Sequence, residues 1–264
     1  MSVSDMLLPC EIVEGLDTEI FGRKEIIHFR ETDSTNARAR ELADQGAPEG
    51  TLVVAERQTQ GRGRKGRTWF SPPGAGIYAS LILRPSMPPN EATRITFLTA
   101  VAAAEVLLHL TDLDVRIKWP NDILVNGRKV AGILTEISTE RGAVDYAVVG
   151  LGMNVNTPAF PDDIRERATS ILIETGKRFP RTDLLREYLR REEAYLRRLR
   201  TSGFEPILKR WKELADTIGK EIRVEMMDRT YVGWVEDINS EGILILKDRK
   251  GVSHRILSGD VVLL

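Results

Sequence analysis

Residues 58–69 combine charged side chains and a flexible backbone in a pattern that suits anion binding. The core of this stretch is Gly-Arg-Gly-Arg-Lys-Gly-Arg at 61–67, and Trp69 follows it. Arginine and lysine supply positive charge and hydrogen-bond donors for phosphate or carboxylate groups, while glycine lets the backbone approach a ligand closely. The composition predicts a mobile loop that closes on an anion rather than a packed wall.

The same glycines match the dinucleotide-binding fingerprint G-x-G-x-x-G, but the surrounding sequence excludes that interpretation. In that motif the glycines open a helix, and an acidic residue about 20 positions further on binds the ribose. Here a Ser-Pro-Pro-Gly run at 71–74 prevents such a helix, and the expected acidic position is Ile82. A Walker A loop is excluded as well, because no Gly-Lys-Ser or Gly-Lys-Thr ends the segment.

A second polar cluster, Asp-Ser-Thr-Asn at 33–36, precedes a helical pattern at 37–45. These residue types are preferred at helix N-caps, so the cluster has a purely structural explanation. The alternative is that Ser34, Thr35 and Asn36 direct hydroxyl groups and free backbone N–H groups into a pocket that holds a small polar ligand. The residues alone leave both interpretations open.

A third cluster, Lys-Trp-Pro-Asn-Asp at 118–122, follows a strand-like run at 115–118. The aliphatic stem of Lys118 could simply pack along apolar surface beside Trp119. It could equally bring a point charge to an α-phosphate, where negative charge shifts during adenylyl transfer. Both interpretations stay open for this lysine when it is considered alone.

The elements that must position these clusters are expected to form an α+β fold. Strands outnumber helices and Asn126-Gly127 is a strong hairpin signal, so we expect a mixed, largely antiparallel sheet with helices packed on it. The expected strands lie at 25–29, 51–56, 76–83, 115–118, 123–125, 129–137 and 147–155, and the expected helices at 37–45, 93–110, 183–200 and 204–215. Thr182 is expected to cap the helix at 183–200.

From residue 219 onward the pattern changes to short alternating strands. They are expected at 222–226, 230–235, 243–246, 253–256 and 261–264. Their spacing and the glycines beside them predict a small five-stranded SH3-like barrel. We therefore expect a catalytic domain at 1–217, of which 1–24 form a short N-terminal extension, and an SH3-like domain at 218–264.

Composition limits the classes of function. The 264 residues carry a formal net charge of −1, so the cationic loop is a local feature and not part of a generally basic nucleic-acid-binding surface. Cys10 is the only cysteine, which argues against disulfides and thiolate zinc sites and favours the cytoplasm, and the three histidines are scattered. No signal peptide and no run of about 18 apolar residues is found, so no membrane segment is expected.

Several motifs stand in the order found in biotin protein ligases, and the chain resembles that family. They are Asp-Ser-Thr-Asn at 33–36, the segment 56–69, Lys-Trp-Pro-Asn-Asp at 118–122, Lys-Val-Ala-Gly-Ile-Leu at 129–134 and Gly-Leu-Gly-Met-Asn-Val at 150–155. The segment from Gly219 resembles the SH3-like domain of the family, so the similarity covers about residues 25–264. The resemblance implies the class II synthetase-like fold of biotin and lipoate ligases.

The resemblance also implies a reaction in two halves. Biotin and ATP, with Mg²⁺ on the phosphates, would give biotinyl-5'-adenylate and pyrophosphate, and a lysine of a biotin carboxyl carrier protein would then attack the mixed anhydride. Cations are needed to offset the repulsion between a carboxylate and a triphosphate. No protein ligands for the metal are assigned, and a homodimer through an exposed sheet is a further expectation.

Site residues are carried over from the family by motif position. The residues implied to be catalytic are Lys118 and Arg64. Those implied to contact biotin are Ser34, Thr35, Asn36, Gln58, Gly61, Arg62, Gly63, Arg64, Trp69, Lys118 and Gly132. Those implied to contact ATP or its phosphates are Arg62, Arg64, Lys65, Arg67, Trp69, Lys118, Asn121 and Asn154.

Two alternatives remain at this point. A lipoate-protein ligase of the same superfamily uses similar chemistry, although the loop at 61–67, the block at 118–122 and the SH3-like tail favour biotin. A nucleic-acid-binding regulator that uses the charged loop is the other, and the near-neutral net charge disfavours it. Regulatory members of the family carry an N-terminal winged-helix domain, for which residues 1–24 leave no room, so we expect no repressor activity and no DNA binding.

Overall fold

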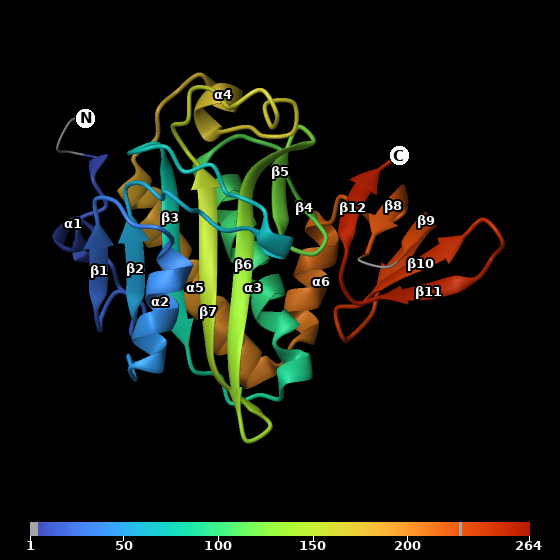
Figure 1. Ribbon diagram of the computed structural model, residues 1–264, viewed down its shortest axis with the longest axis horizontal. Helices are drawn as coiled ribbons and strands as arrows, with labels where there is room; N and C mark the ends of the chain where they lie inside the picture. Colours follow the sequence, from blue (N-terminus) through green and yellow to red (C-terminus); the bar gives the residue numbers. More distant parts are fainter. Residues whose placement is uncertain (1–4, 227–228) are drawn as a thin grey trace.

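The computed structural model describes residues 5–226 and 229–264, which form two β-sheets and the helices packed on them (Figure 1). The larger sheet has seven strands in the order β1-β2-β3-β7-β6-β5-β4. Their bounds are β1 (Ile26–Phe29), β2 (Leu52–Ala55), β3 (Gly76–Leu83), β4 (Val115–Lys118), β5 (Asp122–Val125), β6 (Arg128–Glu140) and β7 (Ala143–Asn154). Only β1 and β2 pair in parallel within this sheet, which confirms the mixed, largely antiparallel α+β fold.

Helices cover both faces of this sheet, and the alternation of strand residues shows why. On one face, Val53 of β2 and Val148 of β7 pack against Ala39 and Ala43 of α2 (Thr35–Asp44). Neighbouring strand residues point to the opposite face, where they join the main core with three helices. These are α3 (Thr93–Leu110), α5 (Arg181–Ser202) and α6 (Glu205–Leu214).

The helix α3 lies in the centre of the core. A stretch that includes it, Pro89–Leu110, is long and apolar enough to cross a membrane, but 61% of its most apolar window is buried inside the protein. It begins after a 3₁₀ turn (Pro89–Glu91) and packs on α5 and α6. It is therefore a helix of the protein core.

The N-terminal segment is packed more firmly than a short extension would suggest, although its first four residues lie outside the described residues. Ile12 in the short helix α1 (Pro9–Val13) and Phe21 beyond it are fully buried. Glu193 of α5 accepts hydrogen bonds from the backbone N–H groups of Glu19, Ile20 and Phe21 at 2.7, 2.7 and 3.0 Å. The sequence did not predict these contacts, because they join segments far apart in the chain.

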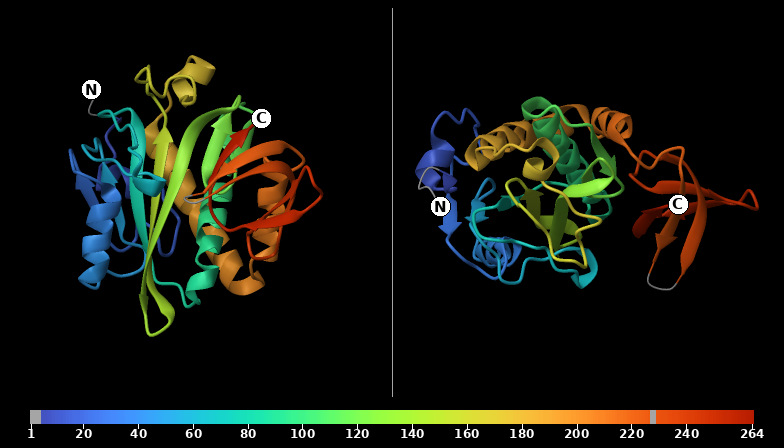
Figure 2. Two further views of the ribbon diagram at one scale, coloured as in Figure 1. Left: turned by 45° about the vertical axis from the view of Figure 1, so that its right-hand side comes forward. Right: turned by 90° about the horizontal axis from the view of Figure 1, so that it is seen from above.

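The smaller sheet is antiparallel and lies beside the β4 edge of the larger one (Figures 1 and 2). Its strands are β8 (Glu221–Glu225), β9 (Thr230–Ile238), β10 (Leu244–Asp248), β11 (Ser253–Ile256) and β12 (Asp260–Leu263), in the order β11-β10-β9-β8-β12. The loops after β4 and β9 connect the two parts of the protein, because Trp119 Nε1 donates to Gly242 O at 3.3 Å. This arrangement confirms the small five-stranded C-terminal domain.

One local prediction is wrong. The helix α5 begins at Arg181 with Pro180 as its N-cap, and no side chain caps it. Thr182 therefore lies inside the helix instead of capping it. Pro180 explains the shift, because proline immediately before the first turn has a fixed φ and suits the approach to a helix.

Candidate active site

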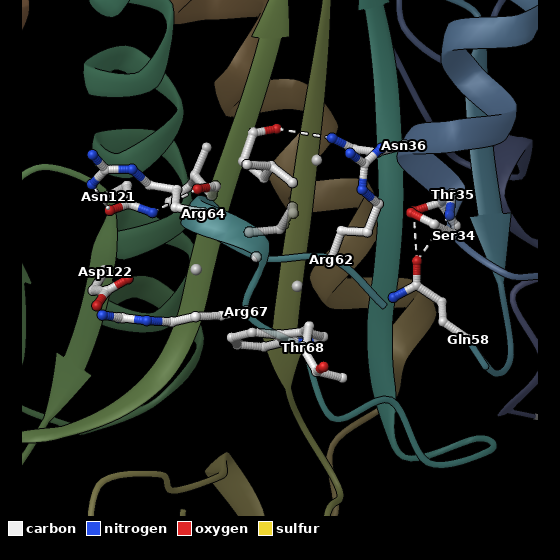
Figure 3. A pocket seen from close by; sticks show the side chains of 18 of the residues that line it. Ser34, Thr35, Asn36, Gln58, Arg62, Arg64, Arg67, Thr68, Asn121 and Asp122 are labelled. Atoms are coloured by element: carbon white, nitrogen blue, oxygen red, sulfur yellow. Dashed lines mark hydrogen bonds between the residues drawn. The ribbon is translucent and has the colours of Figure 1, made fainter. Parts of the chain in front are cut away.

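A cavity opens on the face of the seven-stranded sheet that carries α2 (Figure 3). It is bounded by the start of α2, by the loop between β2 and β3, by the turn between β4 and β5, and by β6 and β7. The lining residues are Ser34, Thr35, Asn36, Gln58, Arg62, Gly63, Arg64, Arg67, Thr68, Trp69, Ala79, Asn121, Asp122, Lys129, Gly132, Ile133, Leu134, Gly150, Leu151, Gly152 and Asp260. Most of the residues predicted to form the site therefore come together here.

Glycines on two neighbouring strands leave the floor of the cavity bare. Gly132 of β6 pairs with Gly152 of β7, and Gly150 lies two residues before Gly152 on the same face. A Cβ atom on Gly152 would lie 2.5 Å from Trp69 Cε2, and one on Gly132 would lie 3.2 Å from Trp69 Cζ3. The indole can rest on the sheet only because these positions have no side chain.

One end of the cavity is a polar cluster around the start of α2 (Figure 3). Gln58 Oε1 accepts hydrogen bonds from the backbone N–H of Thr35 at 2.8 Å and from its Oγ1 at 3.2 Å. Ser80 Oγ of β3 lies 2.8 Å from Thr35 Oγ1 and 2.7 Å from Asn36 Oδ1. The sequence singled out Thr35, Asn36 and Gln58 but missed Ser80, because a serine inside an apolar strand run carries no motif.

The position of Ser34 favours the pocket interpretation of the polar cluster over helix capping. It is the N-cap residue of α2, but its side chain makes no capping hydrogen bond. Its side chain lines the cavity and is almost completely buried. Helix capping alone therefore does not explain why a hydroxyl stands at this position.

The cationic loop brings Arg62, Arg64 and Arg67 to the cavity. Arg62 Nη2 lies 3.4 Å from Glu136 Oε1, and Arg64 Nη1 donates to Asn121 Oδ1 at 3.0 Å. Asn121 is itself held by a bond from its Nδ2 to Ile133 O at 2.7 Å. Burial lowers the pKa of the Arg64 guanidinium, so its charge is poorly solvated, and an incoming anion would stabilise it.

Lys129 is a charged residue of the cavity that the motif-based assignment did not name. Its Nζ lies 2.6 Å from Asp122 Oδ1 inside the cavity and 5.2 Å from the centre of the Trp69 ring. The ammonium of Lys118 lies 3.6 Å from the other oxygen of Asp122, and Lys118 is not one of the described residues that line the cavity. The hairpin signal Asn126-Gly127 predicts that β6 lies alongside β5, but it does not reveal which face Lys129 occupies.

Asp122 is an anion held between cations. Burial by itself would raise its pKa, but the charges of Lys129, Lys118 and Arg64 together with the hydrogen bond from Lys129 hold the pKa below its usual value. The carboxylate is therefore ionised at neutral pH and fixes the two lysine ammonium groups on either side of it.

Lys65 and Arg67 point toward the C-terminal sheet, while Gly61 and Asn154 lie outside the lining of the cavity. Lys65 Nζ and Arg67 Nη2 both reach Asp260 Oδ2 of β12, at 3.2 and 2.5 Å. Lys65 has a φ of 56° in the 3₁₀ turn η2 (Arg64–Gly66), and this left-handed conformation turns the loop toward the C-terminal sheet. Gly61 lines an adjoining cavity outside the loop, and buried Asn154 donates to Thr169 O at 3.0 Å.

Comparisons with known proteins agree with this geometry. Residues 28–154 match the biotin/lipoate A/B protein ligase family, and residues 217–264 match the biotin protein ligase C-terminal domain. The chain is 40% identical over 255 residues to the bifunctional ligase/repressor BirA of Bacillus subtilis, which covers 96% of this chain and 78% of that protein. It is 36% identical over 228 residues to the biotin–[acetyl-CoA-carboxylase] ligase of Paracoccus denitrificans, covering 83% of this chain and 93% of that one.

A solved structure shows the same architecture. The biotin protein ligase of Aquifex aeolicus in complex with biotin and ATP superposes with a TM-score of 0.79 at 30% identity, covering 91% of this chain and 99% of that chain. The segments that match the two family models include the sheet that bears the cavity and the C-terminal sheet. The chain therefore belongs to the biotin protein ligase family.

Proposed function

We propose that this ligase joins biotin to ATP, giving biotinyl-5'-adenylate and pyrophosphate, and then transfers the biotinyl group to a carrier protein. In the first step a biotin carboxylate oxygen attacks the α-phosphorus and pyrophosphate leaves. In the second, a neutral lysine amine attacks the acyl carbon, AMP leaves, and the amine loses a proton. The acceptor is a biotin carboxyl carrier protein, and we place the reaction in the cytoplasm.

The observation that carries this proposal is the division of the cavity into a polar end and a cationic end. The polar end offers hydrogen-bond donors and acceptors from Ser34, Thr35, Asn36 and Gln58, which suit a ureido group. The cationic end offers Lys129 and Arg64, with Asp122 between the lysines. A ligand with a ureido ring and a carboxylate tail fits this polarity.

Lys129 is the best-placed cation for the carboxylate and the α-phosphate. Its ammonium lies above Gly132, near the indole of Trp69, so it faces the cavity. A fixed cation lowers the barrier when negative charge is brought together, since it costs no reorganisation during the reaction. Lys118 would then support it through the shared carboxylate of Asp122.

The loop residues would serve the phosphates once they leave their present partners. Arg64, Arg67 and Asn121 already line the cavity, and Lys65 and Arg67 are paired with Asp260. Closure of the loop over the adenylate would keep water away from the mixed anhydride. Trp69 and Gly132 would form the adjoining wall, with Asn154 supporting the site from behind through Thr169.

Mg²⁺ would arrive with ATP and shield the phosphate charges. It is usually held by one or two carboxylates together with substrate phosphates. Asp122 is an ionised carboxylate on the cavity wall, so it fits this role.

Biotin is favoured over lipoate because the C-terminal segment matches the biotin protein ligase C-terminal domain. The nucleic-acid alternative is weakened because three of the four loop cations lie close to protein carboxylates. The homodimer remains a prediction.

The test is incubation of the protein with ATP, Mg²⁺ and biotin, followed by mass spectrometry. We expect biotinyl-5'-adenylate and pyrophosphate, and no adenylate when lipoate replaces biotin. Addition of a biotin carboxyl carrier domain should then increase the mass of that domain by one biotinyl group. Adenylate formation with lipoate alone would overturn the assignment.

A further inference from the structure

A β-bulge turns Lys129 toward the cavity. Asp122 and Ile123 of β5 lie opposite Gly132 and Ala131 of β6. The pairing then shifts by one residue between Ile123 and Leu124, so that Leu124 lies opposite Lys129. Val130 is the extra residue of the bulge. With regular pairing Lys129 would lie opposite Val125 and point into the core, because a one-residue shift moves a side chain to the other face.

The backbone of Lys129 is held by a segment that follows β7. Lys129 N donates to Arg167 O at 2.8 Å, and Thr169 N donates to Lys129 O at 2.9 Å. Residues beside a bulge lose regular partners in their own sheet, so outside partners must fix them. The orientation of the lysine thus depends on how firmly the segment 167–169 is held.

One carboxylate secures this segment and the hairpin together. Glu174 lies in the short helix α4 (Ile171–Thr175), near the end of the sheet where β5 and β6 are joined (Figure 1). Its Oε1 accepts hydrogen bonds from Thr169 Oγ1 and, at 2.6 Å, from Arg128 Nη2, and its Oε2 accepts one from Asn126 Nδ2 at 2.7 Å. The Glu174 side chain is only 4% exposed.

We infer that Glu174 is a positioning residue that fixes Lys129 toward the reacting carboxylate. Glu174 accepts hydrogen bonds from Arg128, the residue before Lys129, and from Thr169, whose backbone N–H donates to the carbonyl oxygen of Lys129. The bond to Thr169 is the strongest part of this restraint, because Thr169 is fully buried and its hydroxyl would lose this partner without Glu174. This inference rests on the proposed function, in which Lys129 acts on the carboxylate and the α-phosphate.

The test compares Glu174→Ala with Glu166→Ala. Glu166 immediately precedes the segment 167–169, but its side chain is 86% exposed. Misplacement of a reacting group by about 1 Å can cost about 100-fold in rate. We therefore expect Glu174→Ala to lower kcat for adenylate formation about 10-fold to 100-fold, with the KM for biotin within about twofold. Glu166→Ala should match the wild type.

A double-mutant cycle with Lys129→Ala separates positioning from general stability. If Glu174 acts through Lys129, Glu174→Ala should cost little in the Lys129→Ala background. The same cycle can be measured without turnover as the binding free energy of a sulfamoyl analogue of biotinyl-adenylate, determined by calorimetry for the wild type, both single variants and the double variant. Equal losses in both backgrounds, or an unchanged kcat in Glu174→Ala, would overturn the inference.

Thr169→Val provides a second variant that keeps the volume of the side chain and removes one hydroxyl. It should lower kcat less than Glu174→Ala and show the same dependence on Lys129, and independence from Lys129 would contradict the inference. Glu174→Gln should restore part of the loss. If wild-type protein forms no adenylate, the proposed function fails; if it does and Glu174→Ala is unaffected, only the role of Glu174 fails.

Discussion

Two lysines share the carboxylate of Asp122, but only Lys129 reaches the cavity. Lys129→Ala should lower the rate of adenylate formation about 100-fold to 1,000-fold, the usual cost of removing one electrostatic donor from a reacting centre. Lys118→Ala should cost less, because its charge acts through Asp122. Pyrophosphate release under single-turnover conditions measures both, and a larger loss in Lys118→Ala would restore the assignment made from the motif.

Arg64 bonds the neutral amide of Asn121, so its charge is available to an anion. Arg64→Gly should weaken retention of the adenylate and add flexibility to the loop. The intermediate should then escape and acylate lysines of unrelated proteins. Streptavidin blotting of bystander albumin is the measurement, and labelling no higher than with wild type would count against retention by this residue.

At the residue scale, the motifs identified most of the segments that line the cavity, but they did not identify all of its polar and charged side chains. Ser34, Thr35, Gln58, Arg62 and Arg64 line the cavity, as the motifs led us to expect. Lys129 was missed because a bulge decides which face it occupies, and no residue type signals that register shift. Ser80 was missed because its role depends on contacts with α2.

Glu192 of α5 is fully buried among the core helices, where Thr99 Oγ1 donates to its Oε1 at 2.7 Å. Burial raises its pKa from 4.5 to about 8, although the hydrogen bond from Thr99 opposes the shift. The unfolded chain therefore loses this proton at lower pH than the folded protein. The contribution of Glu192 to the free energy of unfolding is therefore greatest below pH 4.5, and it decreases as the pH rises from 4.5 toward about 8.

Glu192→Gln should remove this pH dependence. A tenfold change in proton affinity is worth about 1.4 kcal/mol, so the effect is large enough to measure by thermal unfolding. The Tm of the variant relative to wild type should increase between pH 5 and pH 9. Exposed Glu166→Gln is the control, and parallel Tm profiles for wild type and Glu192→Gln would refute the role of burial.

At the element scale, local patterns were sufficient where one face of an element is apolar. The bounds of α3 and β3 are those predicted, because periodicity and flanking proline define them. The packing of α1 and of the backbone at 19–21 was not predicted, since Glu193 lies about 170 residues away. Side chains that cap distant backbone leave no periodic signal in the sequence.

At the scale of the whole molecule, Asp260 links the cationic loop to the C-terminal sheet through Lys65 and Arg67. Exposed ion pairs are each worth about 0.2 to 1 kcal/mol. Asp260→Asn should therefore increase the hydrogen exchange of loop amides at 61–68 about two- to fivefold in the absence of nucleotide. Asp237→Asn, which removes the ion pair with Lys212 elsewhere between the domains, should leave those amides unchanged.

If Lys65 and Arg67 bind the phosphates as proposed, the nucleotide and the C-terminal sheet compete for these two cations. Phosphates that bind Lys65 and Arg67 would replace Asp260 as the partner of these two cations. Such a competition is thermodynamically reciprocal, so whatever tightens the loop on the nucleotide weakens the hold on β12 by the same free energy. Binding of ATP would thus order one part of the enzyme and loosen its neighbour, and the C-terminal sheet would gain freedom when the intermediate is sealed in.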